Sequence, residues 1–238
     1  MDAQTRSALK KEDPFIHSTQ VGLDWIAENR GKALRIAIGV LVVIALVIAS
    51  VVVYEQRSAA AANAFGSAAS LYSTPIADPA QPAPPGMKTF ATIADRAKAA
   101  NPLFEDVANR YGSTTAGKNA LFFAALTSAE MGNNAAAEAG FRKAGDLHDA
   151  NLASLAHLAL ANLLTQHGQT GEAIRLYQDL INHPTSTVPA ATAQLQLAQL
   201  YEANNNGAEA NKIYALLKAK DTTTAAGQIA AQKLSGQH

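Results

Sequence analysis

The sequence predicts an all-α protein in which a single transmembrane helix is followed by an α-solenoid of helix-turn-helix repeats. Three observations lead to this prediction. Residues 33–54 form an apolar run with one charge, the rest of the chain is rich in Ala and Leu, and small and aromatic residues recur in it at a nearly constant interval. Ala and Leu are strong helix formers. No stretch shows the sustained alternation that half-buried strands require.

Residues 1–32 are predicted to form a head that ends in a juxtamembrane helix. The first 14 residues are polar. Between residues 15 and 29, several apolar side chains fit one face of a helix: Ile16, Val21, Trp25 and Ile26. Such a face suits a helix that lies on a membrane surface or leads into a span. A plain polar lead-in is the alternative interpretation.

The 22 residues from Ala33 to Tyr54 are predicted to be a transmembrane signal anchor. At 1.5 Å per residue, a helix of this length spans about 33 Å, which matches a hydrocarbon core of about 30 Å. A cleaved signal peptide and a buried helix of a soluble protein are the alternatives. The apolar core of a signal peptide is shorter, at about 7–15 residues.

The basic residues beside this run predict its orientation. Arg30, Lys32 and Arg35 crowd the N-terminal flank, whereas Arg57 on the other side has no basic neighbour until Lys88. Basic residues are retained on the cytoplasmic side of a membrane. We therefore expect the head to lie inside and the larger C-terminal part outside.

Residues 55–73 are expected to continue the anchor as a helix and to supply the first repeat helix. Phe65, Ala68 and Tyr72 recur there with helical spacing. Residues 74–87 contain five prolines, which cannot sustain a helix. This Pro-rich segment is predicted to be a long loop between the two helices of the first pair.

Residues 88–238 are predicted to form repeats that end in a capping helix at residues 225–235. The second helix of each pair is recognised by a small residue that is followed four positions later by an aromatic residue. These pairs are Ala100 and Phe104, Ala137 and Phe141, Ala173 and Tyr177, and Ala210 and Tyr214. These marks recur every 36 or 37 residues. A helical pair cannot bury its own apolar face, so stacked repeats bury a continuous core.

The segment QHGQTGEAIRLYQDLINHP at residues 166–184 resembles a tetratricopeptide repeat. It carries the small, aromatic and apolar positions and the closing proline of that family, at Gly168, Ala173, Tyr177, Leu180 and Pro184, after a helix with Leu160, Ala161 and Leu164. It departs from the family pattern at His157, where a large residue is usual, and in Pro184, which comes one residue early. The resemblance implies a protein-binding array.

Composition and motifs argue against an enzyme. The 19 basic and 19 acidic residues give no net charge, so no electrostatic attraction for nucleic acid is expected. The chain lacks cysteine, which excludes disulfides, thiol catalysis and thiolate metal sites. The six histidines show no metal-ligand spacing and are expected at the surface or in turns. We expect no catalytic residues, no cofactor, no metal and no small-molecule substrate.

One segment imitates a phosphate-binding loop. Residues 112–119 read GSTTAGKN, but Asn119 stands where such a loop needs Ser or Thr for magnesium. The preceding residues are also helical in character, whereas a phosphate-binding loop follows a buried strand. The segment is interpreted as a turn between repeats, with Ser113 or Thr114 capping the next helix.

In tetratricopeptide arrays, the first helix of each pair lines a concave groove in which extended peptides or partner helices dock. The resemblance transfers the groove positions to Asn119, Phe122, Leu126, Glu130, Leu155, Leu158, Asn162, Gln166, Leu195, Gln199 and Glu202. About half are expected to face the groove, since some of the leucines suit the core. The mixture favours an uncharged extended segment over a carboxylate clamp. The chain's own residues 74–87 are an alternative occupant.

The head with LDWIAENRGKAL, the single anchor, the continuation NAFGSAASLY and the repeats together resemble the YfgM-like family of bacterial inner-membrane tetratricopeptide proteins. The resemblance implies an inner-membrane protein with a cytoplasmic N-terminus and a periplasmic C-terminal domain. It also implies an accessory subunit of the SecYEG translocon that hands secreted clients to periplasmic chaperones. A cell-envelope scaffold for cell-wall or outer-membrane assembly machinery is the alternative function.

Overall fold

The computed structural model describes residues 27–78, 80, 84, 86, 88–220 and 223–236. The apolar face expected between residues 15 and 26 lies outside the described residues, as do parts of the Pro-rich segment. The chain divides into two compact units, Met1–Gln56 and Arg57–His238.

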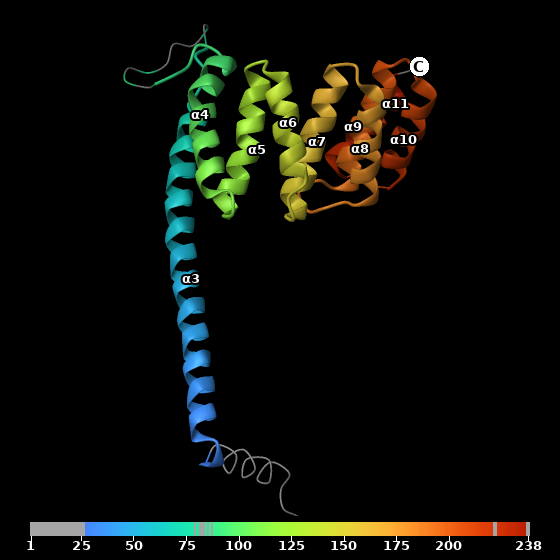
Figure 1. Ribbon diagram of the computed structural model, residues 1–238. Helices are drawn as coiled ribbons and strands as arrows, with labels where there is room; N and C mark the ends of the chain where they lie inside the picture. Colours follow the sequence, from blue (N-terminus) through green and yellow to red (C-terminus); the bar gives the residue numbers. More distant parts are fainter. Residues whose placement is uncertain are drawn as a thin grey trace, which may run out of the picture. The chain divides into compact units, whose positions relative to one another are not determined.

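Helices dominate the described residues, and no strand is found in that part of the chain (Figure 1). The helices are α3 (Arg30–Tyr72), α4 (Ile93–Tyr111), α5 (Thr115–Glu130), α6 (Asn134–Gly145), α7 (Ala150–Gln166), α8 (Thr170–Asn182), α9 (Ala190–Ala203), α10 (Gly207–Lys220) and α11 (Ala225–Ser235). The predicted all-α fold is therefore confirmed.

The helix α3 carries the apolar run. Its most apolar 18-residue window has a mean hydropathy of 3.3, and none of that window is buried. By length and composition this helix can cross a membrane, as a single-pass anchor requires. From residue 57 onward α3 belongs to the second unit, where Phe65, Ala68 and Tyr72 pack in one apolar cluster with Phe104 of α4 and Ala120 of α5.

The connection between α3 and α4 is closed at its base by a parallel bridge between Ile76 and Phe90. The amide of Ala77 donates to the carbonyl of Phe90 over 2.8 Å, and the amide of Phe90 donates to the carbonyl of Pro75 over 3.0 Å. Two backbone hydrogen bonds thus hold the two ends of the Pro-rich loop together.

From α4 to α11 each helix packs chiefly against its neighbours in the chain. The first helices of successive pairs are also in contact, α5 with α7 and α7 with α9, and α9 contacts α11. Side-chain oxygens cap several helix starts: Thr92 caps α4, Thr114 caps α5, Asn133 caps α6 and Asp149 caps α7. Each cap satisfies a backbone amide that lacks a partner in the first turn.

The small and aromatic residues that recur along the sequence form the core. The four small residues at 100, 137, 173 and 210 are completely buried, and the four aromatic residues at 104, 141, 177 and 214 are at most 2% exposed. The turns inside the pairs repeat as well, because Gly132, Gly168 and Asn205 all have positive φ, near 77°, 72° and 61°. Positive φ favours Gly and tolerates Asn.

The segment that imitates a phosphate-binding loop is a turn between repeats, as expected. Thr114 is the N-cap of α5, and its hydroxyl oxygen accepts a hydrogen bond from the amide of Gly117 over 3.1 Å. A Cβ atom on Gly117 would lie 1.9 Å from the carbonyl oxygen of Tyr111. Glycine is needed here for close approach of two backbone segments.

His157 is not a simple surface residue, which corrects one expectation. It is half-buried in α7. Its ring lies against Gly145 at the end of α6, where a Cβ atom would come within 2.4 Å of Nε2. The imidazole therefore fills the space that a larger residue at 145 would need, and takes the packing role of the large residue that this position usually holds.

Candidate protein-binding face

The candidate groove residues lie on the first helices of three successive pairs, and the surface they form is called the α5–α7–α9 face here. Asn119, Phe122, Leu126 and Glu130 belong to α5, Leu155, Leu158, Asn162 and Gln166 to α7, and Leu195, Gln199 and Glu202 to α9. Within each helix they are three or four residues apart, so each set shares one side of its helix. Gln166 is exposed, Leu195 is buried, and the others are half-buried.

The structure separates the apolar candidates from the polar ones. Phe122, Leu126 and Leu158 pack against the central apolar cluster, and Leu155 packs against a smaller one around Val188. Leu195 is 9% exposed and is a member of the cluster formed by α9, α10 and α11. These side chains contribute to the core, which leaves the polar candidates to give the face its chemistry.

A cavity of about 450 Å³ lies between α7 and α9. Three candidates line it: Asn162, Gln166 and Gln199. The remaining lining residues are Thr165, Tyr177, Gln196, Leu200 and Ala203. The cavity brings four carboxamide side chains together, and its volume falls within the range of ligand sites in proteins, about 300–1,000 Å³.

The hydroxyl of Tyr177 orients one of these carboxamides. Tyr177 extends from α8 and is 1% exposed. Its hydroxyl donates a hydrogen bond of 2.7 Å to Oδ1 of Asn162, and it lies 3.5 Å from the hydroxyl of Thr165. Burial raises the pKa of Tyr177, so the hydroxyl keeps its proton at neutral pH and remains a donor.

Glu202, at the end of α9, is tied to two other helices. Oε2 accepts a hydrogen bond of 2.9 Å from the hydroxyl of Tyr214 in α10 and one of 2.8 Å from Nζ of Lys233 in α11. Lys233 first, and Tyr214 second, hold the pKa of Glu202 below its ordinary value. The carboxylate is thus neutralised within the fold.

Glu130, two repeats earlier, is held by a tyrosine hydroxyl and a more distant guanidinium. Oε1 accepts a hydrogen bond of 2.6 Å from the hydroxyl of Tyr72, and Nη2 of Arg96 is 4.0 Å away. The guanidinium of Arg96 lies 4.6 Å from the centre of the Tyr72 ring, a cation–π geometry. Burial, followed by Glu130, raises the pKa of Tyr72 to about 12. Both acidic candidates therefore have partners inside the fold.

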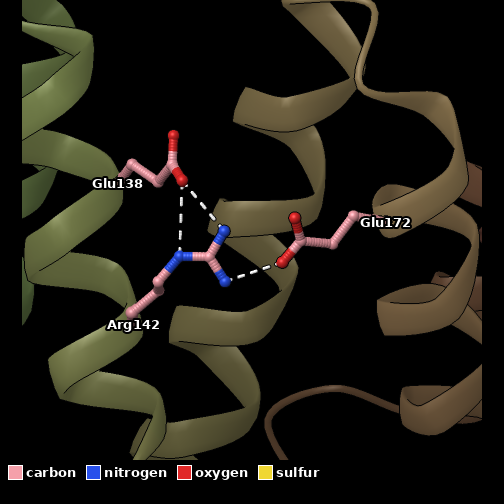
Figure 2. A network of polar contacts seen from close by, with 3 residues as sticks. All are labelled: Glu138, Arg142 and Glu172. Atoms are coloured by element: carbon pink, nitrogen blue, oxygen red, sulfur yellow. Dashed lines mark hydrogen bonds and ion pairs between the residues drawn. The ribbon is translucent and has the colours of Figure 1, made fainter.

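The second helices carry a polar contact of their own (Figure 2). Arg142 of α6 lies 2.9 Å from Glu138 in the same helix and 2.6 Å from Glu172 in α8. All three side chains are partly exposed, so this contact stabilises the fold by about 1 kcal/mol or less. It links the second helices of two successive repeats.

Sequence reasoning missed several residues of the face. Thr165, Gln196, Leu200 and Ala203 line the cavity, and Lys233 neutralises Glu202 from a distance of 31 residues along the chain. One signal was present: the aromatic position is Phe at 104 and 141 but Tyr at 177 and 214. A hydroxyl at a buried position requires a polar partner, and those partners mark the polar part of the face.

Among the described residues no cluster of three or more His, Cys, Asp or Glu side chains is placed to hold a metal ion.

A family model described as a tetratricopeptide repeat-like domain matches residues 24–179. No significant match is found among curated proteins or among solved structures. The buried register of the repeats continues beyond the matched residues, because Ala210, Tyr214 and Leu217 are buried in the same order as Ala173, Tyr177 and Leu180.

Proposed function

The chain belongs to the tetratricopeptide repeat-like family, and from this premise we propose that it is a membrane-tethered scaffold that binds other proteins through the α5–α7–α9 face. Its repeats indicate a protein–protein interaction scaffold, a role that is typically non-catalytic. The observation that carries the proposal is the cavity between α7 and α9, because it offers polar side chains to a partner on the helices that bind ligands in this family.

The proposed tether is the apolar run at residues 33–54, with the head in the cytoplasm and the repeats in the periplasm of a bacterium. The exposed apolar surface of α3 supports a span, and Arg30, Lys32 and Arg35 support the orientation. In this arrangement the protein is an accessory translocon subunit that passes secreted clients to periplasmic chaperones. This finer role rests on the resemblance of the anchor and head to the YfgM-like family.

The orientation is directly testable because the chain has no cysteine. Single cysteines are introduced by Ser7→Cys in the head and by Ser113→Cys in the exposed turn before α5. A membrane-impermeant maleimide applied to spheroplasts is expected to label Ser113→Cys immediately and Ser7→Cys only after detergent. The reverse pattern would contradict the proposed topology, and labelling of both without detergent would contradict the span.

The partners are tested by site-specific photocrosslinking in intact cells. A photoreactive amino acid at Ile44 in the span is expected to yield adducts with translocon subunits. The same amino acid at Gln199 on the α5–α7–α9 face is expected to yield adducts with secreted clients. Glu105, on the exposed side of α4, is the matched control position. Client adducts of equal yield from Glu105 would contradict the proposed face.

An exchange of the anchor separates the translocon role from the alternative role of an envelope scaffold. If residues 33–54 are replaced by an unrelated span, the translocon role predicts loss of the translocon adducts and of client transfer. A variant that keeps full function with a foreign anchor would contradict the translocon role and favour the scaffold.

A further inference from the structure

We propose that the turn before α5 holds the phosphate headgroup of an anionic phospholipid, at the surface of the membrane to which the chain is tethered. The headgroup site is a pocket of about 100 Å³ that Lys118 of α5 and Lys143 of α6 line. Gly117, Leu121 and Leu147 are among its other lining residues. The proposal rests on the proposed tether and is independent of the proposed binding of protein partners.

The chain connects this turn closely to the apolar run. Arg57, the first residue of the second unit, is the third residue after Tyr54, where the run ends. Three residues of extended chain cover at most about 11 Å. Nη2 of Arg57 donates a hydrogen bond of 2.9 Å to the carbonyl of Arg110, in the last turn of α4. The turn that follows Arg110 is therefore within reach of any membrane that the run crosses.

The two lysines give the pocket a positive charge that the fold does not compensate. Within the described residues, neither Lys118 nor Lys143 forms an ion pair, and no acidic side chain lines the pocket. The nearby acids have other places: Asp106 is in an ion pair within α4, Asp149 caps α7, and Asp146 is exposed. Two ammonium groups without acidic partners favour a ligand that carries negative charge.

The site differs from a nucleotide-binding loop, although Lys118 stands at the lysine position of the segment that imitates one. The backbone amide of Gly117 donates to the hydroxyl oxygen of Thr114, so this amide is not available to a phosphate. The second charge comes from Lys143 of the next helix, which only the folded repeats bring to the same pocket. The two side chains bind phosphate as point charges, as lysine commonly does.

The apolar part of the pocket suits a lipid better than free phosphate. Leu121 and Leu147 are half-buried and line the pocket together with the lysines. A free phosphate ion loses hydration beside apolar side chains and gains nothing from them. The glycerol carbons and first methylene groups that accompany a lipid phosphate bury apolar surface against the two leucines. A phosphate on an apolar stem is therefore the ligand that matches both halves of the site.

The first test places the full chain in nanodiscs of zwitterionic phosphatidylcholine, with or without phosphatidylglycerol, and with lipids that carry a quenching nitroxide at the headgroup. Because the chain lacks cysteine, Thr115→Cys carries a single fluorophore at an exposed position on the same side of α5 as Lys118. Phosphatidylglycerol is expected to strengthen the quenching about twofold or more, and high salt to abolish that gain. Ala135→Cys, exposed at the start of α6, is the matched control and is expected to show no difference.

The second test measures the lipid directly, by native mass spectrometry of the full chain in detergent titrated with phosphatidylglycerol. Lys118→Gln and Lys143→Gln are each expected to weaken binding by about 2- to 10-fold. The double variant Lys118→Arg with Lys143→Arg keeps both charges and is expected to retain binding. Lys98→Gln, at an exposed position in the first half of α4, is the matched control and is expected to leave the affinity unchanged. Circular dichroism verifies that the variants fold, and Lys143, which is exposed, tolerates replacement most readily.

The proposal is overturned if phosphatidylglycerol does not change the quenching at Thr115→Cys, if the variant that combines Lys118→Gln with Lys143→Gln keeps its affinity for this lipid, or if an equal concentration of inorganic phosphate displaces the lipid. Release of the chain from membranes by alkaline carbonate would contradict the tether, which is a different result. Loss of client adducts from Gln199 in a chain that still selects phosphatidylglycerol would contradict the proposed binding face and support the headgroup site.

Discussion

The two halves of the repeat array use the same helical framework with different side-chain chemistry. The first half, residues 57–145, is joined by aromatic rings: Phe104 stacks on Phe123 with centroids 5.2 Å apart, and Phe65 and Tyr72 contact both of them. The second half, from α7 to α11, places tyrosine hydroxyls on Asn162 and Glu202. The first half thus centres on a cluster of rings, although the hydroxyl of Tyr72 also reaches Glu130 there. In the second half a tyrosine hydroxyl reaches a residue of the face in each of two successive repeats.

This difference shows how a repeat can be specialised without changing its backbone. Phe141 and Tyr177 are equivalent, both are at most 2% exposed, and they differ by one hydroxyl group. That hydroxyl requires an acceptor, and the acceptor is a residue of the proposed binding face. The half of the array that contains the end of α3 holds the ring cluster, and the other half contains the cavity between α7 and α9 that carries the proposed binding of partners.

The largest effect is expected from Phe104→Ala in the first half. Phe104 is completely buried and contacts three other rings. Truncation of a buried Phe costs about 3–5 kcal/mol through lost burial and the cavity left behind. Urea unfolding of the full chain in detergent, followed by circular dichroism, measures the loss. An effect no larger than that of Tyr177→Phe would remove the distinction between the two halves.

A second strong effect is expected from Gly117→Ala at the turn before α5. The new Cβ would lie 1.9 Å from the Tyr111 carbonyl oxygen, so backbone must move, at a cost near the upper end of the usual range for overpacking, about 3 kcal/mol. Gly171→Ala in α8 is the matched control, because nothing lies within 4 Å of its Cβ position. The control is expected to be neutral or slightly stabilising. Equal losses at both sites would contradict the steric explanation.

The fold was predictable because its core positions repeat along the chain. Ala137, Phe141, Ala173 and Tyr177 could be placed in the core from their spacing alone, since each is a fixed offset within a helical pair. The position of Thr114 as a helix cap followed from local chemistry in the same way. Such features depend on near neighbours in the sequence and need no knowledge of the tertiary structure.

The polar contacts were not predictable from spacing. Lys233 reaches Glu202 and Arg96 approaches Tyr72 only because the helices stack in one particular register. His157 was expected at the surface because its packing partner, Gly145, has no side chain to reveal the contact. The candidate groove residues remain a proposal, and the structure adds Gln196, Thr165 and Tyr177 around the cavity.

An intermediate effect is expected when the chemistry of the second half is transferred to the first. In Phe141→Tyr the new hydroxyl would point toward position 126, the equivalent of Asn162, where Leu126 cannot accept a hydrogen bond. A buried hydroxyl without a partner costs about 1–3 kcal/mol. The double variant Phe141→Tyr with Leu126→Asn is expected to recover part of that loss. A double-mutant cycle on urea unfolding measures the coupling, and a coupling of zero would contradict the equivalence of the two sites.

The smallest effect on stability is expected when the pH is lowered. Glu172 and Glu202, whose pKa values the fold lowers, lie in α8 and α9. A carboxyl group with a lowered pKa in the folded state binds protons more readily when unfolded. Its stabilising contribution is therefore present above about pH 4.5 and is lost as the pH falls through the lower folded value. For the partly exposed pair of Glu202 and Lys233 the loss is expected to be about 1 kcal/mol or less.

The substitution Glu202→Gln tests this origin of the acid sensitivity. The amide cannot titrate, so the unfolding midpoint of the variant in urea is expected to fall less between pH 6 and pH 3 than that of the unchanged chain. Lys233→Met removes the cation that contributes most to the lowered pKa and is expected to flatten the same pH dependence. If both variants keep the full acid dependence, the contact of Glu202 in α9 with Lys233 in α11 is not its source. The polar contacts of the second half would then serve binding and not stability.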